Sequence, residues 1–421
     1  MDETRISLWL RVREFAVPGA MIETCTARRL AGDWAGACAA AGFDLDLDPR
    51  ALPPPVRADL RYLAPELLRW HLPRIAPDGL LRPGLTMTLA RYGPVHLVVR
   101  TAPAWADAGQ RVSLALWGRG GAGAHPHPRP DRRFRLDLHR HLWDVRRAGE
   151  LGVRCGADVS SASVIACGAV DFRGQPPPSG CATNRWADEA RILLEADDRP
   201  PGPVLVRLGA RRRAIVNLSP GVPCPRGSLT ALPVLPDAAT WTLPDLELLR
   251  TGAITPDRLH PLVAAALAPG HPPPEKPDAP EQLLVECRGE QHRLGLRNGT
   301  LTALDHTPAE LRREELLIAL TGTPLPCLRV IDQAHRNPDA LAGVGERLRH
   351  GDIAGALAMV ENLLGPDTLL RDGPLRAELD AAAERRITHG RYRAGLTPAC
   401  PPPRRTERRT TRAHPRHATQ R

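Results

Sequence analysis

The stretch "GLTMTLARYGPVHLVVRT", residues 84–101, contains two successive runs rich in apolar and β-branched residues. Such runs, separated by turn-forming residues, are typical of β-strands. A third run of the same kind, "RVSLALWG", follows at 111–118. Three strand-like runs in succession predict an antiparallel meander at the centre of the first half of the chain.

Helices are predicted before this meander, together with one further strand. "RISLWLRV", residues 5–12, alternates with a period of two and predicts a strand whose apolar face carries Ile6, Leu8, Leu10 and Val12. Residues 21–43 predict a helical hairpin broken at Gly32-Asp33, where glycine ends one helix and aspartate caps the next. Residues 57–75 show helical spacing, with Pro65 at a kink or in a first turn.

The segment after the meander predicts a mixture of elements. Residues 132–151 predict an extended lead-in that runs into a helix, and 185–196 predict a helix capped by Asn184. Residues 203–208 and 212–218 predict a β-hairpin. Short helices are expected at 245–252 and at 255–268, where Thr255 would be the cap and Pro256 the first helical residue.

The proline-rich stretch "APGHPPPEKPDAPE", residues 268–281, is predicted to be a linker. After it, Asn298-Gly299 predicts a type I′ hairpin, and Thr307 with Glu310 forms a capping-box pattern. Helices are expected at about 325–336, 338–350, 352–364 and 373–389. The predicted organisation is therefore a mixed domain at 1–218, a proline-rich connection at 219–281, a hairpin and helical domain at 282–395, and a disordered arginine-rich tail at 396–421.

These elements together predict an α+β fold, with antiparallel strands and helical hairpins in the N-terminal domain and a β-hairpin followed by a small helical unit in the C-terminal domain. No run approaches the length of a membrane span, and the N-terminus lacks the continuous apolar core of a secretory signal. The nine cysteines are odd in number and scattered, unlike a secreted disulfide framework. We therefore expect a cytoplasmic protein with free thiols.

The string Gly-Asp-x-Ala-Gly-Ala occurs twice, in "RRLAGDWAGACAAAGF" (28–43) and in "RLRHGDIAGALAMVENLL" (347–364). Residues 348–373 resemble the second half of an ankyrin repeat, although the Thr-Pro-Leu-His motif of that family is missing. The resemblance implies a protein-binding repeat. A lone repeat cannot bury its own face, so ordinary helical hairpins are the other interpretation of the two strings. The arginine- and alanine-rich sequence is also similar to large families of GC-rich bacterial proteins without an assigned activity, and that resemblance implies no chemistry.

The sequence contains no phosphate-loop, nucleophile-elbow or zinc-protease motif, so no cofactor and no catalytic residue is predicted. An enzyme of unrecognised type stays open, because a site assembled from distant residues leaves no local motif. His125-x-His127 and His139-x-His141, with Cys155, Cys167 and Cys181 downstream, would be the candidates for metal ligands. Close Cys-x-x-Cys pairs are missing, so a metal site is not predicted.

The tail carries seven arginines and one glutamate, a net charge of +6 within a total of +10. These arginines are candidate contacts to nucleic acid or to another anionic surface, through phosphate neutralisation: Arg404, Arg405, Arg408, Arg409, Arg412, Arg416 and Arg421. The sequence therefore favours a non-enzymatic interaction or adaptor protein with an unknown protein partner and no membrane partner. The alternative function is binding of nucleic acid through the tail.

Overall fold

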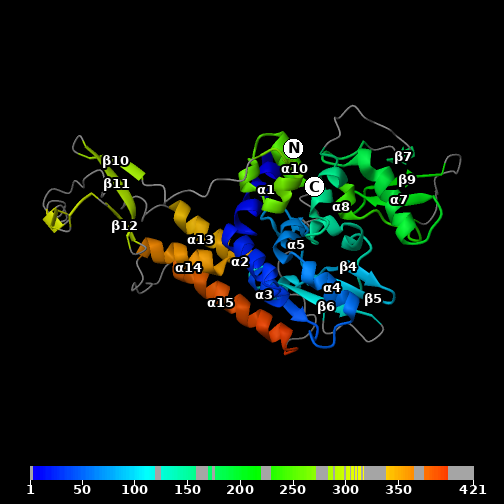
Figure 1. Ribbon diagram of the computed structural model, residues 1–421, viewed down its shortest axis with the longest axis horizontal. Coiled ribbons are helices and arrows are strands. Elements are labelled where there is room, and N and C mark those ends of the chain that lie inside the picture. The colour runs from blue at the N-terminus through cyan, green and yellow to red at the C-terminus, as the bar shows by residue number, and fades with distance from the viewer. Residues whose placement is uncertain are drawn as a thin grey trace. The chain divides into compact units, whose positions relative to one another are not determined.

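The computed structural model of the chain describes residues 3–118, 125–157, 169–172, 176–219, 229–271, 283–287, 290–297, 300–303, 305–307, 309–310, 312–313, 316, 338–364 and 374–396. Its contacts form two compact units: Met1–Pro272 with Arg385–Arg421, and Pro273–Glu384. The fold class is α+β, as predicted (Figure 1). The four domain ranges expected from the sequence stay predictions.

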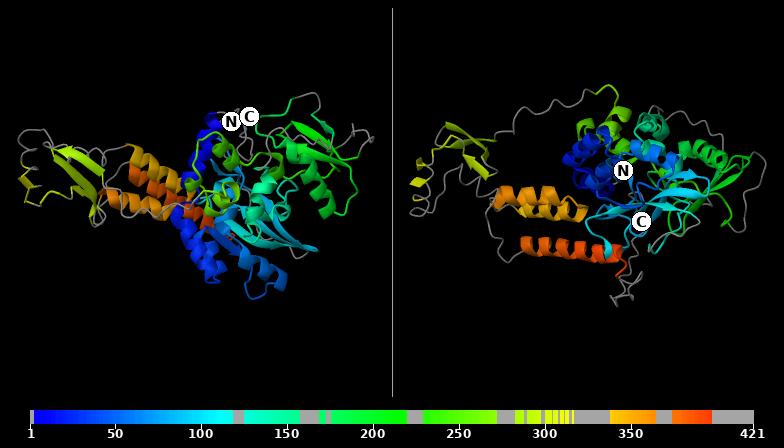
Figure 2. Two further views of the ribbon diagram at one scale, coloured as in Figure 1. Left: turned by 45° about the horizontal axis from the view of Figure 1, so that its top comes forward. Right: turned by 60° about the horizontal axis from the view of Figure 1, so that its bottom comes forward.

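The main sheet of the first unit has the strand order β1-β6-β5-β4. Figures 1 and 2 show its strands β4, β5 and β6 side by side in light blue to cyan. Its strands are β1 (Phe43–Asp46), β4 (Thr86–Tyr92), β5 (Val95–Thr101) and β6 (Val112–Trp117). β4, β5 and β6 pair antiparallel, which confirms the predicted meander. β1 was not predicted, and it adds a parallel edge in which Phe43 pairs with Val112. A separate two-stranded ribbon joins β2 (Arg74–Ile75) and β3 (Leu80–Leu81).

Helices pack against this sheet and share one hydrophobic core with it, centred on large side chains such as Trp9, Leu68, Trp70, Val99 and Trp143. The helices are α1 (Glu3–Phe15), α2 (Gly19–Leu30), α3 (Trp34–Ala40), α4 (Pro54–Tyr62), α5 (Pro65–His71), α6 (Leu151–Cys155), α9 (Pro244–Arg250) and α10 (Pro261–Leu267). Pro65 lies in the first turn of α5, which is one of the two positions expected for it.

A second sheet forms its own core within the first unit. β7 (Ala169–Asp171), β9 (Arg213–Asn217) and β8 (Pro203–Arg207) pair in that order, and α7 (Trp186–Ala196) and α8 (Asp237–Thr240) cover them. The β8–β9 pairing confirms the predicted hairpin. Figure 1 shows this sheet and α7 as a lobe beside the main sheet. The first unit therefore contains two hydrophobic cores.

The predicted strand at residues 5–12 is wrong, because this segment belongs to helix α1. Leu8 and Val12 fit a period of two, but they are also four residues apart on one helical face. Trp9 decides between the two patterns, since its side chain is only 1% exposed and lies in the main core. Burying an indole next to Leu8 requires the helical face.

The predicted helix within residues 132–151 is also wrong. Three short 3₁₀ turns stand in place of the expected helix: η2 (Leu136–Leu138), η3 (Arg140–Leu142) and η4 (Ala148–Glu150). Arg140 donates hydrogen bonds to Asp59 and Asp144, and Trp143 donates its indole N–H to the Leu136 carbonyl oxygen at 2.9 Å. These tertiary contacts outweigh the helical spacing of the apolar residues.

Two predicted caps differ from the structure. The helix near Asn184 begins at Trp186 after the 3₁₀ turn η5 (Thr183–Arg185), without a side-chain cap. Pro256 begins the 3₁₀ turn η6 (Pro256–Arg258), and α10 begins later, at Pro261, where the His260 side chain accepts the N–H of Leu262. A second proline five residues after the first divides the expected helix, because proline cannot donate within it.

The second unit begins with the antiparallel strands β10 (Leu283–Cys287), β11 (Glu290–Arg297) and β12 (Thr300–Ala303). Arg297 pairs with Thr300, which confirms the hairpin, although Asn298 and Gly299 lie outside the described residues. Thr307 and Glu310 form the expected capping box: the Thr307 N–H donates to Oε2 at 2.7 Å, and the Glu310 N–H donates to Oγ1 at 3.3 Å. The expected helix at 325–336 lies outside the described residues.

Three predicted helices of the C-terminal part are confirmed: α13 (Pro338–His350), α14 (Ile353–Leu364) and α15 (Pro374–Arg393). Residues 374–384 of α15 belong to the second unit, and its last residues belong to the first. Among the described residues, no helix has the length and apolar character needed to cross a membrane.

The repeated Gly-Asp string is a helical hairpin in both places. Gly32 and Gly351 have φ values of +79° and +90°, and the following aspartates cap the next helix by accepting the N–H of Gly36 at 2.7 Å and of Gly355 at 3.0 Å. Each aspartate also pairs with an arginine five residues before it, Arg28 in the first hairpin and Arg347 in the second. The shared letters therefore encode one local turn, and the ankyrin resemblance stays a prediction.

We expect Gly351→Ala to lower the free energy of unfolding of the second unit by about 1 kcal/mol, because a Cβ atom is strained in the left-handed region. Gly345→Ala is the matched control: Gly345 lies inside α13, and a Cβ atom there meets open space. Gly345→Ala should raise the free energy of unfolding of the second unit by about 0.5–1 kcal/mol. Hydrogen exchange of the α13 and α14 amides measures the change in unfolding free energy that each substitution causes. If both substitutions stabilise the second unit, or both destabilise it, the assigned turn is contradicted.

Candidate functional site

A pocket lies in the first unit between its two hydrophobic cores. It encloses about 690 Å³ of empty space, including the part that opens to solvent. Its lining comes from helices α1, α5, α6, α7 and α8 and from the turns η3 and η5. The lining residues used below are Trp9, Arg13, Trp70, His139, His141, Arg154, Cys155, Arg185, Glu189, Ala238 and Trp241.

A buried carboxylate organises one wall of the pocket. Glu189 on α7 is 3% exposed and accepts two hydrogen bonds from Arg154, from Nε at 2.9 Å and from Nη2 at 2.8 Å. Nη2 of Arg185 lies 3.8 Å from Oε1 of the same carboxylate. Two guanidinium groups therefore share one negative charge, and this wall carries a net charge of +1.

A fully buried ion pair supports the part of the lining that comes from α1 and α5. Asp245 accepts hydrogen bonds from Nε and Nη2 of Arg13, both at 2.7 Å, and it lies 3.3 Å from the indole nitrogen of Trp70. The guanidinium carbon of Arg13 lies 4.8 Å from the ring centre of Trp9 and 4.3 Å from that of Trp70. The charges of this pair cancel, so Arg13 fixes the two indoles without adding net charge to the pocket.

Four polar groups of the lining side chains are buried without a hydrogen-bond partner in the described structure. They are the indole nitrogens of Trp9 and Trp241, Nε of Arg185 and Nδ1 of His141. Buried polar groups in native proteins are nearly always paired, and a group without a protein partner requires another explanation, such as a water molecule or a ligand. Their gathering around one pocket is the strongest local indication of function in the part of the chain that the structure describes.

The structure brings together some of the residues considered as metal ligands. His139 and His141 line the pocket with Cys155, and the two imidazole rings are 5.5 Å apart. Burial, with smaller contributions from His139 and the nearby arginines, lowers the pKa of His141 well below its usual value, so its ring is neutral. No group of three or more His, Cys, Asp or Glu side chains among the described residues could hold a metal ion.

The other candidates for metal ligands lie elsewhere. His125 uses both ring nitrogens: Nε2 lies 3.0 Å from the Thr101 carbonyl oxygen, and Nδ1 accepts the N–H of His127 at 3.1 Å. Cys181 pairs through its backbone with Trp241, and Cys167 lies outside the described residues. Burial raises the pKa of Cys155 to about 11 and that of Cys181 to about 12, so both thiols stay protonated near neutral pH.

No protein-family model matches this chain, and no curated protein and no solved structure shows significant similarity to it.

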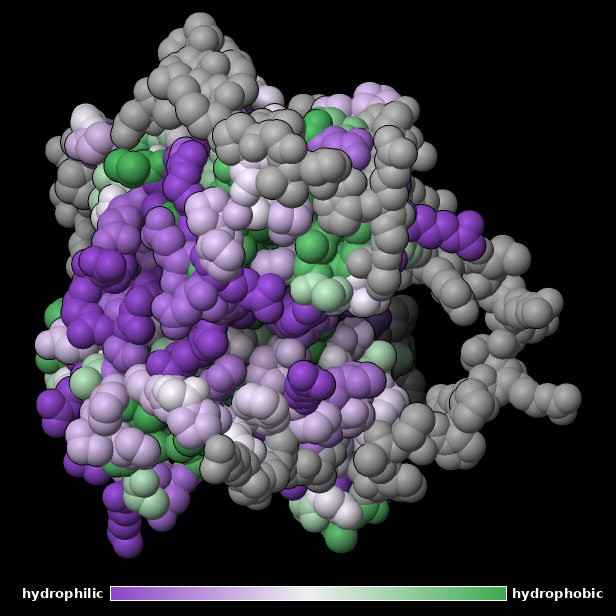
Figure 3. Space-filling view, turned by 90° about the vertical axis from the view of Figure 1, so that its right-hand side faces the viewer, coloured by the Kyte–Doolittle hydropathy of each residue, from purple (hydrophilic) through white to green (hydrophobic). Residues whose placement is uncertain are grey.

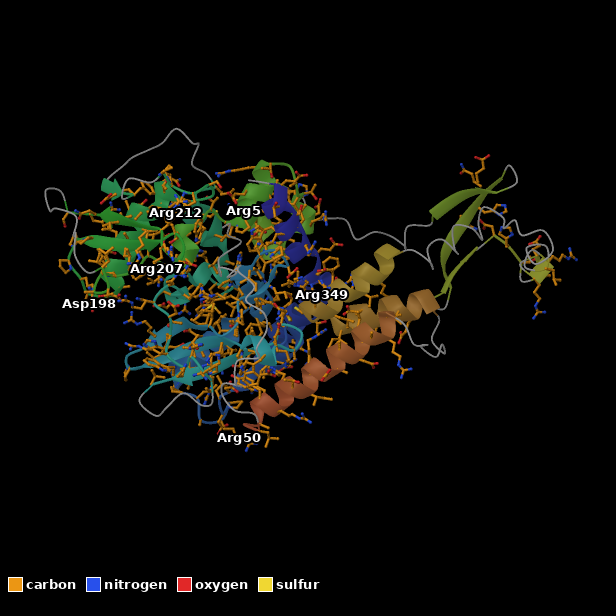
Figure 4. The ribbon with its side chains drawn as sticks, turned by 180° about the vertical axis from the view of Figure 1, so that it is seen from behind. Arg5, Arg50, Asp198, Arg207, Arg212 and Arg349 are labelled. Atoms are coloured by element: carbon orange, nitrogen blue, oxygen red, sulfur yellow. The ribbon has the colours of Figure 1, made fainter. Side chains whose placement is uncertain are left out.

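The predicted anion contacts in the tail, Arg404 to Arg421, lie outside the described residues, so binding through the tail stays a prediction. Other arginines of the first unit are spread over different elements: Figure 4 shows Arg207 and Arg212 at the β8–β9 hairpin and Arg50 far from them. On the face shown in Figure 3, hydrophilic residues cover most of the described surface, and hydrophobic residues form small separate patches.

The main pocket residues, Arg154, Arg185, Glu189 and the three tryptophans, were not predicted from the sequence. These residues are far apart in the sequence, and none belongs to a recognisable motif. One signal was available: eight of the few aromatic residues are tryptophans, and all eight lie before residue 242. Such a bias indicates indole-rich packing or binding in the first unit, although it does not say which tryptophans meet.

Proposed function

We propose that the protein is a non-enzymatic cytoplasmic binding protein whose first unit holds a small organic molecule in this pocket, and that it works as an interaction or adaptor component. The observation that carries the proposal is the set of four buried, unpartnered polar groups around an indole-walled pocket. Four cysteines of the described part are free thiols, which supports the cytoplasmic assignment.

The chemistry of the lining side chains favours binding over catalysis. The Cys155 thiol is protonated near neutral pH because burial raises its pKa, so it is a poor nucleophile. The carboxylate of Glu189 is engaged by two hydrogen bonds from Arg154, so both of its oxygens already have a partner. These groups fix the shape and charge of the pocket, which is what a binding site needs.

The test uses N-phenyl-1-naphthylamine, a neutral aromatic probe whose fluorescence rises in apolar surroundings. We expect saturable binding of one probe per chain, with energy transfer from the pocket tryptophans. Ala238→Trp fills the pocket and should weaken binding at least about tenfold. Ala104→Trp is the control, because Ala104 is exposed and outside the pocket.

Two results would refute the proposal. One is the absence of saturable probe binding by the folded, unmodified chain. The other is equal binding by Ala238→Trp and the unmodified chain, provided that the variant keeps the near-ultraviolet circular dichroism of the folded protein.

A second candidate function, binding of nucleic acid through residues 401–421, is supported by the net charge of +6 in that segment. Its test is removal of the segment, which should abolish binding to duplex DNA at about 50 mM salt, where phosphate contacts are strong. Equal binding by the shortened chain would reject the tail as the contact.

A further inference from the structure

We infer that the molecule held in the pocket is an aromatic carboxylate, with its ring against the indole walls and its carboxylate at Arg185. This inference rests on the proposed function and names the class of ligand for the same site. Three properties of the pocket carry it: the net charge of its walls, the kind of hydrogen-bonding groups left free, and the chemistry of the surrounding side chains.

The charge of the lining residues favours a monoanion. Asp237, which also lines the pocket, accepts hydrogen bonds from Arg133 at 2.8 Å, and Arg13 is neutralised by Asp245. The remaining ionised groups are the two arginines that share Glu189. One positive charge is therefore left without a counter-charge in a partly enclosed site, and a single carboxylate on the ligand would balance it.

Three of the four free hydrogen-bonding groups can only donate, and the fourth, Nδ1 of the neutral His141 ring, donates or accepts according to its tautomer. An indole N–H and a guanidinium N–H can only donate, and these are the unpartnered groups of Trp9, Trp241 and Arg185. The acceptors of the same walls are used: Glu189 accepts from Arg154, and Asp237 accepts from Arg133. A ligand that completes this site must bring acceptor atoms, and a carboxylate brings two oxygens with several lone pairs.

Arg185 is placed to receive the anion. One end of its guanidinium group donates to the Val153 carbonyl oxygen, which holds the group at the pocket wall. Nη2 is too far from Glu189 for a direct hydrogen bond, at 3.8 Å, and Nε has no partner. Nε and Nη2 form one fork of the guanidinium group, and this fork matches the two oxygens of a carboxylate.

The rest of the wall fits an aromatic group. The indoles of Trp9, Trp70 and Trp241 lie among the apolar side chains of Leu142 and Leu151. Aromatic rings pack well against indoles in edge-to-face or offset arrangements. His141, neutral because of its burial, adds a polar group without adding charge.

The test compares 1-naphthoate with 1-naphthamide as competitors of N-phenyl-1-naphthylamine. The two competitors share the same ring and nearly the same shape, and differ mainly in charge. We expect 1-naphthoate to displace the probe at a concentration at least about tenfold lower. Arg185→Gln should bring the two competitors within about twofold of each other, and Arg185→Lys should keep an intermediate preference.

Arg191→Gln is the matched control, because Arg191 lies on α7 beside the pocket, pairs with the exposed Asp188 and does not line the pocket. It should keep the full preference for 1-naphthoate. If the probe binds but the two competitors are equal in the unmodified chain, or if Arg185→Gln keeps the preference, the carboxylate inference is wrong and the pocket remains a binding site. If the probe itself does not bind, the proposed function fails instead.

Discussion

Asp245→Ala is expected to lower the free energy of unfolding of the first unit by about 3–5 kcal/mol, the cost of breaking a buried ion pair from one side. Asp245 and Arg13 are 0% and 6% exposed. Burial lowers the pKa of Arg13, and the charge of Asp245 opposes this shift, so removal of the carboxylate leaves a cation between two indoles without a counter-charge. Denaturant unfolding followed by tryptophan fluorescence measures the loss, since all eight tryptophans lie in this unit.

Two further variants test whether the loss comes from the unpaired charge. Arg13→Met combined with Asp245→Ala removes both charges and should recover at least half of the lost stability. Asp188→Ala breaks the exposed pair with Arg191 and should change stability by less than about 0.5 kcal/mol. A loss below about 1 kcal/mol in Asp245→Ala would show that the pair does not hold the pocket wall.

Glu66→Gln is expected to change the free energy of unfolding differently at pH 8 and at pH 5. The change at pH 8 should be more stabilising than the change at pH 5, by up to about 3 kcal/mol. Glu66 is 0% exposed, its carboxylate oxygens have no hydrogen-bond partner, and the nearest described cation, Arg29, is 3.9 Å away. Burial raises the pKa of this carboxyl to about 7 from an ordinary value of 4.5. The native state therefore holds a proton that the unfolded chain releases at a lower pH.

The direction of the pH effect follows from this difference in bound protons. Between about pH 4.5 and 7, the native state binds more protons at Glu66 than the unfolded state does. The contribution of Glu66 to the free energy of unfolding therefore falls as the pH rises through this range. Above pH 7 the carboxyl is ionised in both states, and the contribution no longer changes. A glutamine side chain cannot ionise, so the unfolding free energy of the variant does not show this decrease with pH. The measurement is the difference in unfolding free energy between the two proteins from pH 5 to pH 8. A difference that does not change with pH would contradict the buried, unpaired carboxyl.

The sequence was sufficient where a local pattern determines local structure. The meander of β4, β5 and β6, the β8–β9 hairpin, the capping box at Thr307 and both Gly-Asp hairpins follow from residues close together in the chain. The helix α1 and the 3₁₀ turns after Arg135 were predicted wrongly, because burial of Trp9 and the ion pairs of Arg140 depend on distant partners.

The pocket could not be predicted for the same reason. The Arg154–Glu189 pair spans 35 residues, and the Arg13–Asp245 pair spans 232. Neither pair has a signature in the sequence, since arginine and acidic residues occur throughout the chain. The arginine-rich tail, by contrast, is evident from composition alone, but composition does not say what it contacts.

The pocket, with the free indole N–H groups of Trp9 and Trp241, is proposed to bind an aromatic anion. The most direct measurement is nuclear magnetic resonance of the indole N–H groups of the full chain during titration with 1-naphthoate, with each signal assigned by single Trp→Phe substitutions. We predict that the signals of Trp9 and Trp241 shift most and saturate, while those of Trp34 and Trp105, which are outside the pocket, stay in place. Saturating shifts at Trp34 or Trp105 without shifts at Trp9 and Trp241, or no shift at any tryptophan, would contradict the claim.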